Sequence, residues 1–129
     1  MAILRVLVIE DDGGITAALE LVLAVDGHEV LVAPDGITGL KRLRTPPPPD
    51  IVLVDLALPG MGGRELVELV AGDSGMDRVP IIVMTAASGA DLLPKSGTYR
   101  ALLRKPFEIE EVLRLVAQLQ PGAGGVAEN

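Results

Sequence analysis

Acidic residues follow two apolar segments of the chain, at the point where each segment ends. Residues 6–9 lead into Glu10 and Asp11, and residues 51–54 lead into Asp55. If these segments are neighbouring strands, Asp11 and Asp55 lie close together and repel each other unless a cation lies between them. Carboxylates, a backbone carbonyl and water form the kind of oxygen site that suits Mg²⁺. The acidic residues therefore predict a magnesium site.

A hydroxyl and an ammonium group follow two later apolar segments. Residues 81–84 end at Thr85, and residues 101–103 are followed after one residue by Lys105. Beside a magnesium ion, a hydroxyl and an ammonium are the groups needed to hold a phosphoryl group. A carboxylate can itself be the nucleophile and become an acyl phosphate. The ends of the four segments together indicate phosphoryl transfer to a carboxylate.

The apolar segments have the pattern of strands in a sheet. Residues 51–54 form an unbroken apolar run, which is typical of a strand buried on both faces of a parallel sheet. Residues 29–33 are less apolar, as an edge strand is. Apolar residues recur at helical spacing in residues 15–23, 37–43, 66–70 and 109–116. Five strands alternating with helices predict a doubly wound α/β fold of three layers, in which ligands bind at the carboxyl ends of the strands.

Two segments depart from this pattern. Residues 86–100 have room for a helix, but Pro94 and Gly97 interrupt the apolar spacing, so we expect this fourth helix to be short or irregular. Residues 121–129 are rich in glycine and unpatterned, and we interpret them as a disordered tail or the stub of a linker. The domain is therefore predicted to span residues 1–120.

Composition argues against several classes of function. The 129 residues suffice for one domain, and a formal net charge of −7 argues against direct binding of nucleic acid. The absence of cysteine excludes disulfides, thiolate nucleophiles and zinc–thiolate sites. The apolar start is too short for a signal peptide and no run is long enough to cross a membrane, so we expect a cytoplasmic protein. The single histidine, His28, falls in a turn without an evident partner, and we interpret it as structural.

Four segments of the sequence resemble the signature blocks of the response regulator receiver domain. They are VLVIEDD at 6–12, VDLALPGMGG at 54–63, IIVMTA at 81–86 and RKPF at 104–107. The resemblance extends from residue 3 to about residue 119, with family-like spacing except for a slightly short interval between Thr85 and Lys105. It implies a flavodoxin-like α/β/α fold with a five-stranded parallel sheet in the order 2-1-3-4-5.

The resemblance also implies a magnesium site with assigned ligands. Asp11 and Asp55 would bind Mg²⁺ directly, and the backbone carbonyl of Ala57 would be a third ligand from the protein. Glu10 would act mainly through water and would orient Lys105. The predicted cofactor is therefore Mg²⁺.

For the phosphoryl group, the resemblance assigns three residues. Asp55 would be the phosphoacceptor, Thr85 would offer its hydroxyl to the phosphoryl group, and Lys105 would neutralise a phosphate oxygen. The family uses a cis peptide bond between Lys105 and Pro106 to direct the lysine inward, so we expect that isomer here.

The implied donor of the phosphoryl group is a histidine kinase or a phosphotransfer protein, and the implied output is a change in the surface offered to a downstream protein. Such a domain catalyses its own phosphorylation and dephosphorylation but is not an enzyme with an external substrate. Family members commonly carry an aromatic switch residue three positions before the lysine, where this chain has Leu102.

Two other functions compete with this interpretation. The first is a receiver-like interaction domain whose output does not depend on phosphorylation, which the interrupted segment and Leu102 favour. The second is a phosphohydrolase with an aspartyl nucleophile. Such enzymes usually place a second Asp two residues after the nucleophile, and Ala57 occupies that position. A flavin-binding flavodoxin is a weaker alternative, because no phosphate-cradling loop follows the first strand.

Overall fold

The computed structural model describes residues 3–73, 78–86 and 93–119. Five parallel strands form one sheet in the order β2-β1-β3-β4-β5, which is the predicted order. The strands are β1 (Arg5–Ile9), β2 (Glu29–Ala33), β3 (Ile51–Asp55), β4 (Ile81–Ala86) and β5 (Ala101–Lys105). The helices in the described part of the chain are α1 (Gly13–Val25), α2 (Gly36–Arg44), α3 (Gly63–Ala71) and α4 (Ile109–Leu119).

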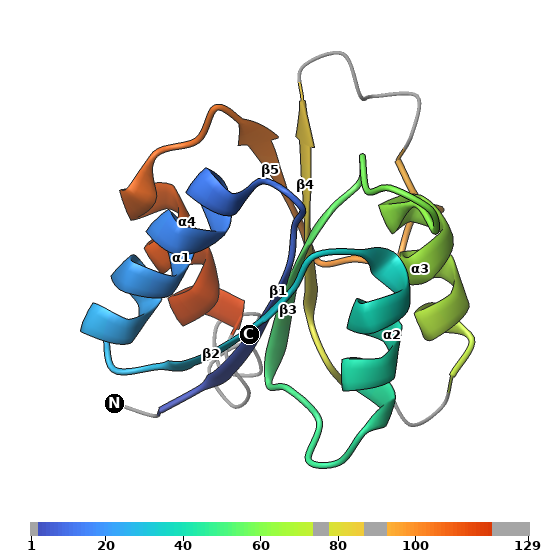
Figure 1. Cartoon of the computed structure of the whole chain (residues 1–129), viewed down its shortest axis with the longest axis horizontal. Coiled ribbons are helices and arrows are strands. Elements are labelled where there is room, and N and C mark those ends of the chain that lie inside the picture. The colour runs from blue at the N-terminus through green and yellow to red at the C-terminus, as the bar shows by residue number, and fades with distance from the viewer. Residues whose placement is uncertain (1–2, 74–77, 87–92, 120–129) are drawn as a thin grey trace, which may run out of the picture.

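The helices cover both faces of the sheet. Figure 1 shows α1 and α4 on one side of the strands, and α2 and α3 on the other. Because successive residues of a strand point to opposite faces, Leu7 and Val54 join one apolar core, whereas Val8 and Leu53 join the other. All five residues of β3 are buried, as its unbroken apolar run predicts. The predicted three-layer, doubly wound fold is thereby confirmed.

The register of the strands places their carboxyl ends along one edge of the sheet. Ile9 of β1 pairs with Val54 of β3, so Glu10 and Asp55 are the next residues on neighbouring strands. In β4 and β5, Ala86 pairs with Lys105. The predicted chemical groups on β1, β3 and β5 therefore reach the same edge.

Carboxylate side chains begin two of the helices that follow this edge. Asp12 caps α1 by accepting hydrogen bonds from the backbone N–H groups of Gly14 and Ile15, at 2.9 and 3.1 Å. Asp35 caps α2 by accepting one from the N–H of Thr38 at 2.7 Å, which lowers the pKa of that carboxyl. These caps fix where each helix starts relative to the strand before it.

Some sequence-based expectations need correction or cannot be compared with the structure. His28 does have partners: its Nδ1 accepts a hydrogen bond from the N–H of Leu4 at 3.1 Å, and its Nε2 lies 3.3 Å from Asp26 Oδ2. Of the segment predicted to form an irregular fourth helix, residues 93–100 contain no helix and residues 87–92 lie outside the described residues. Residues 120–129 also lie outside them, so the predicted domain end stays a prediction.

Among the described residues, none of the helices combines the length and apolar character needed to cross a bilayer.

Candidate functional site

Three acidic side chains meet where β1 and β3 end. Glu10 and Asp55 are buried, with 1% and 4% of their surface exposed, whereas Asp11 is exposed. Each of the three offers a carboxylate oxygen, and these oxygens all lie within 4.8 Å of one another. A set of oxygen donors open to solvent on one side is the chemistry that Mg²⁺ prefers, so the residues present fit that ion.

Lys105 reaches this acidic cluster from the far edge of the sheet. Its Nζ lies 2.7 Å from Glu10 Oε1 and 3.2 Å from Asp55 Oδ2. The second oxygen of each carboxylate is held by the backbone. Asp12 N–H donates to Glu10 Oε2 and Ala57 N–H donates to Asp55 Oδ1, both at 3.2 Å. Both buried carboxylates are thereby oriented by a cation on one side and an amide on the other.

The electrostatics of the site follow from this burial. Burial raises the pKa of Glu10 from 4.5 to about 7, and the neighbouring Asp55 carboxylate adds to the increase while the hydrogen bond with Lys105 opposes it. Burial acts to lower the pKa of Lys105, but the hydrogen bond to Glu10 and the charge of Asp55 outweigh it and raise that pKa. The ammonium group therefore remains charged at neutral pH. This single positive charge does not balance the three carboxyl groups of the cluster.

The remaining predicted residues lie at the same edge. Thr85 is buried near the end of β4, and its hydroxyl donates to the carbonyl of Ala86 at 3.1 Å. Ala57 lies two residues beyond Asp55, at the start of the loop that leads to α3. The peptide bond between Lys105 and Pro106 is cis, as expected. The structure thus brings Glu10, Asp11, Asp55 and Lys105 together directly and places Thr85 and Ala57 beside them.

One feature near the site was missed from the sequence. Gly63, the first residue of α3, packs so closely on the backbone of Asp55 and Leu56 that a Cβ atom there would overlap the Asp55 carbonyl oxygen. A glycine at the first position of a helix is the only sequence signal of such an approach, and that signal does not identify the partner.

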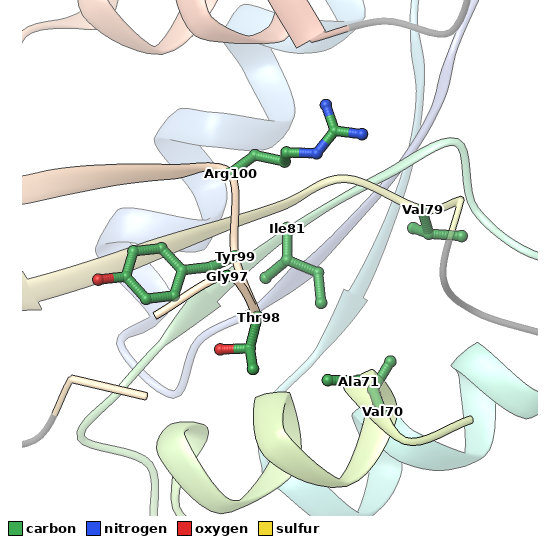
Figure 2. Close-up of a pocket in the computed structure, with 8 residues that line it drawn as sticks. All are labelled: Val70, Ala71, Val79, Ile81, Gly97, Thr98, Tyr99 and Arg100. Atoms are coloured by element: carbon green, nitrogen blue, oxygen red, sulfur yellow. The ribbon is translucent and has the colours of Figure 1, made fainter. Parts of the chain in front are cut away.

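A separate small cavity lies away from these residues. It has a volume of about 120 Å³ and is enclosed by the end of α3, the start of β4 and the segment before β5 (Figure 2). Figure 2 shows Thr98 and Ile81 beside it, and Tyr99 comes from the same segment. Because this cavity opens near the amino end of β4, it is separate from the acidic cluster at the carboxyl end.

Comparison with known proteins gives the same family over nearly the whole chain. The family model described as the response regulator receiver domain matches residues 6–117. The DNA-binding response regulator MtrA of Mycobacterium tuberculosis (strain H37Rv) is 35% identical over 122 residues, which cover 90% of this chain and 50% of MtrA. Sporulation initiation phosphotransferase F of Bacillus subtilis is 30% identical over 119 residues, which cover 91% of this chain and 94% of that protein. The chain thus spans about half the length of MtrA but almost the whole of the Bacillus protein.

Solved structures agree with this assignment. The receiver domain of a sensor histidine kinase from Pseudomonas aeruginosa superposes with a TM-score of 0.81 at 26% identity, covering 92% of this chain and 98% of that one. That structure has a magnesium ion coordinated in its active-site cleft. A putative response regulator from Chloroflexus aurantiacus superposes with a TM-score of 0.78 at 30% identity. With the strand order, the acidic cluster and the family match in agreement, this chain belongs to the response regulator receiver domain family.

Proposed function

We propose that Asp55 is the residue that accepts the phosphoryl group, and that Mg²⁺ binds beside it at Asp11, Asp55 and the backbone carbonyl of Ala57. Glu10 contributes through a bound water molecule and holds Lys105. The observation that carries this proposal is the position of the Lys105 ammonium, which contacts both buried carboxylates while Asp11 remains exposed beside them. No other group of described acidic residues comes together in this way.

The chemistry of the transfer follows from these positions. An oxygen of the Asp55 carboxylate attacks phosphorus, and the new O–P bond forms as the P–N bond to a donor imidazole breaks. That imidazole already carries a proton on its other ring nitrogen, so it leaves as the neutral base. Bound Mg²⁺ supplies positive charge to the phosphoryl oxygens. Lys105 neutralises a further oxygen, and the Thr85 hydroxyl turns from the Ala86 carbonyl to donate to another. Attack of water on phosphorus later restores the carboxylate and releases inorganic phosphate.

The partners follow from the same chemistry. The donor is a histidine kinase or a phosphotransfer protein, and the recipient of the signal is a downstream protein. The MtrA match is to a DNA-binding protein twice the length of this chain. For the receiver itself we propose no direct binding of nucleic acid, because its net charge of −7 opposes a phosphate backbone. We propose the cytoplasm as its location, and self-catalysed phosphorylation and dephosphorylation as its only reactions.

The test is the mass of the intact protein after incubation with acetyl phosphate, with and without Mg²⁺. We expect one added phosphoryl group only when Mg²⁺ is present. Asp11→Asn should strongly reduce the labelling because it removes a metal ligand. Asp12→Asn is the matched control, since asparagine caps a helix as well as aspartate does, and it should label normally. Labelling that is independent of Mg²⁺, or equal in Asp11→Asn and Asp12→Asn, would contradict the proposed metal site.

A further inference from the structure

Three helices that follow the carboxyl edge of the sheet begin with glycine, and the space around these glycines differs. They are Gly13 of α1, Gly36 of α2 and Gly63 of α3. A Cβ atom at Gly13 would have nothing within 4 Å, whereas one at Gly36 would lie 2.5 Å from the carbonyl oxygen of Met61. None of the three has a positive φ, so backbone conformation does not require glycine there. At Gly36, the requirement is the close approach of another segment.

That segment is the loop between β3 and α3, residues 56–62, which we call the phosphoacceptor loop. Its start is held at the site, because Ala57 N–H donates to Asp55 Oδ1 and Gly63 packs against the Asp55 carbonyl. Its end is held by Gly36 against Met61, whose side chain packs partly into the core. Glycine contacts therefore hold the loop at both ends. Gly36 makes its contact from α2, a helix that contributes no group to the site.

Helix α2 packs closely against the sheet beside this loop. Its next glycine, Gly39, faces Ile9 of β1 so closely that a Cβ there would lie 2.6 Å from the Ile9 side chain. Its amino end is capped by Asp35, and Leu43 is buried in the core. Because the helix is packed in this way, we expect a collision at Gly36 to be relieved by movement of the loop.

We propose that Gly36 is a positioning residue for phosphoryl transfer, because it sets the place of the phosphoacceptor loop and thereby of the Ala57 backbone. This inference depends on the proposed function of that loop. A methyl group at residue 36 requires the gap to Met61 to widen from 2.5 Å to beyond 3.0 Å, and the obstacle is backbone rather than a flexible side-chain end. A shift of that size at Ala57 would misplace the carbonyl proposed to bind Mg²⁺.

The test compares three variants: Gly36→Ala, Gly13→Ala and Gly39→Ala. Gly13→Ala is matched in position, since each glycine is the first helical residue after an aspartate cap. Gly39→Ala is matched for a steric clash in the same helix, because its added methyl group would meet the Ile9 side chain. For each variant, thermal unfolding, Mg²⁺ affinity by calorimetry and the initial rate of phosphorylation by acetyl phosphate are measured. Displaced supporting groups weaken metal binding and activity by roughly 10- to 100-fold, so Gly36→Ala should lose about 10-fold or more in both.

The controls separate positioning from stability. Gly13→Ala should retain Mg²⁺ affinity and rate, and Gly39→Ala should unfold at a lower temperature but retain Mg²⁺ affinity while folded. Mg²⁺ affinity in Gly36→Ala equal to that of the original chain would overturn the inference. If the original chain binds no Mg²⁺ and takes no phosphoryl group, the proposed function fails instead, which is a different result.

A measurement on the unsubstituted protein covers the case in which Gly36→Ala does not fold. Titration with Mg²⁺ should shift the amide resonances of Met61 and Gly36 together with that of Ala57, because the loop transmits the change to the helix. The amide of Gly39, farther along α2, should respond less. Shifts at Ala57 without any at Met61 and Gly36 would also overturn the inference.

Discussion

Nζ of Lys105 lies 2.7 Å from Oε1 of Glu10, although Glu10 follows β1 and Lys105 ends β5, which is not a neighbour of β1. In the order β2-β1-β3-β4-β5, the side chain of Lys105 crosses the ends of β4 and β3 to reach β1. The contact closes the acidic cluster on one side and leaves exposed Asp11 on the other.

Replacing Lys105 should slow phosphorylation without abolishing the metal site. Lys105→Ala removes a preorganised cation from the place where negative charge collects during transfer, and loss of one such group typically lowers a rate by roughly 10²- to 10³-fold. We expect a decrease of about 10²-fold in the rate with acetyl phosphate at saturating Mg²⁺. The neighbouring exposed residue gives the control, since Arg104→Ala should react at the original rate. Equal rates in the two variants would show that Lys105 does not contact the phosphoryl group.

The raised pKa of Glu10 predicts a pH dependence of stability in the absence of Mg²⁺. Because the pKa rises from 4.5 to about 7 on folding, the folded chain holds this proton more tightly than the unfolded chain. The contribution of Glu10 to the free energy of unfolding is therefore full below pH 4.5 and is lost as the pH rises through about 7.

The measurement for Glu10 is the difference in melting temperature between the original chain and Glu10→Gln, in chelator, from pH 4.5 to 8. The original chain should lose stability relative to the variant as the pH rises. Saturating Mg²⁺ should reduce this trend, because a bound cation stabilises the ionised cluster. A difference that does not vary with pH would show that folding leaves the pKa of Glu10 unchanged.

Much of the fold could be predicted from the sequence because strand burial and helix spacing are local patterns. The run at residues 51–54 indicated a central strand, and the less apolar run at residues 29–33 indicated an edge strand; both are confirmed. The face of α3 was predicted less well. Leu69, which lies within the apolar spacing of residues 66–70 that predicts this helix, is 42% exposed, whereas Val67 is buried. In so short a helix, several apolar spacings fit equally well until the neighbouring helix is known.

In the site, too, the features that could be predicted are those that follow from local patterns. Residues at strand ends were predictable, because parallel strands bring their carboxyl ends to one edge, and this applies to Glu10, Asp55 and Lys105. The contact of Gly36 with Met61 was not predictable, because it joins two segments whose approach depends on how α2 lies on the sheet. The partners of His28 were missed for a similar reason. Its Nδ1 accepts from the backbone N–H of Leu4, just before β1, and a backbone donor leaves no pattern in the sequence.

His28 should contribute to stability through its hydrogen bond. Its Nδ1 accepts the N–H of Leu4, and both residues are buried. His28→Phe removes the acceptor while keeping a ring, and an unsatisfied buried donor destabilises by about 1–3 kcal/mol. The free energy of unfolding from urea titration should decrease by that amount, with unchanged phosphorylation. His28→Asn keeps an acceptor, and a loss of stability larger than that of His28→Phe would contradict this explanation.

The output surface should respond weakly to phosphorylation. Leu102 occupies the position of the family's switch aromatic and packs partly buried against the core beside α3, as Tyr99 also does. A leucine has no ring to exchange between a buried and a surface environment, and phosphorylation can shift its rotamers only as far as it interacts differently with each of them, so we expect a small shift. Amide shifts on adding Mg²⁺ and beryllium fluoride should be large in residues 56–63 and small in residues 98–104. Equally large shifts in both ranges would show that Tyr99 or the backbone carries the switch.

The identity of the phosphoacceptor is the central claim, and reductive trapping tests it most directly. The protein is incubated with acetyl phosphate and Mg²⁺ and treated with borohydride, which reduces an aspartyl phosphate to homoserine, and its peptides are then sequenced by mass spectrometry. We predict homoserine at residue 55, none when Mg²⁺ is replaced by chelator, and none in Asp55→Asn. Homoserine at residue 11 or 12 with an unmodified Asp55, or labelling of Asp55→Asn equal to that of the original chain, would contradict the account.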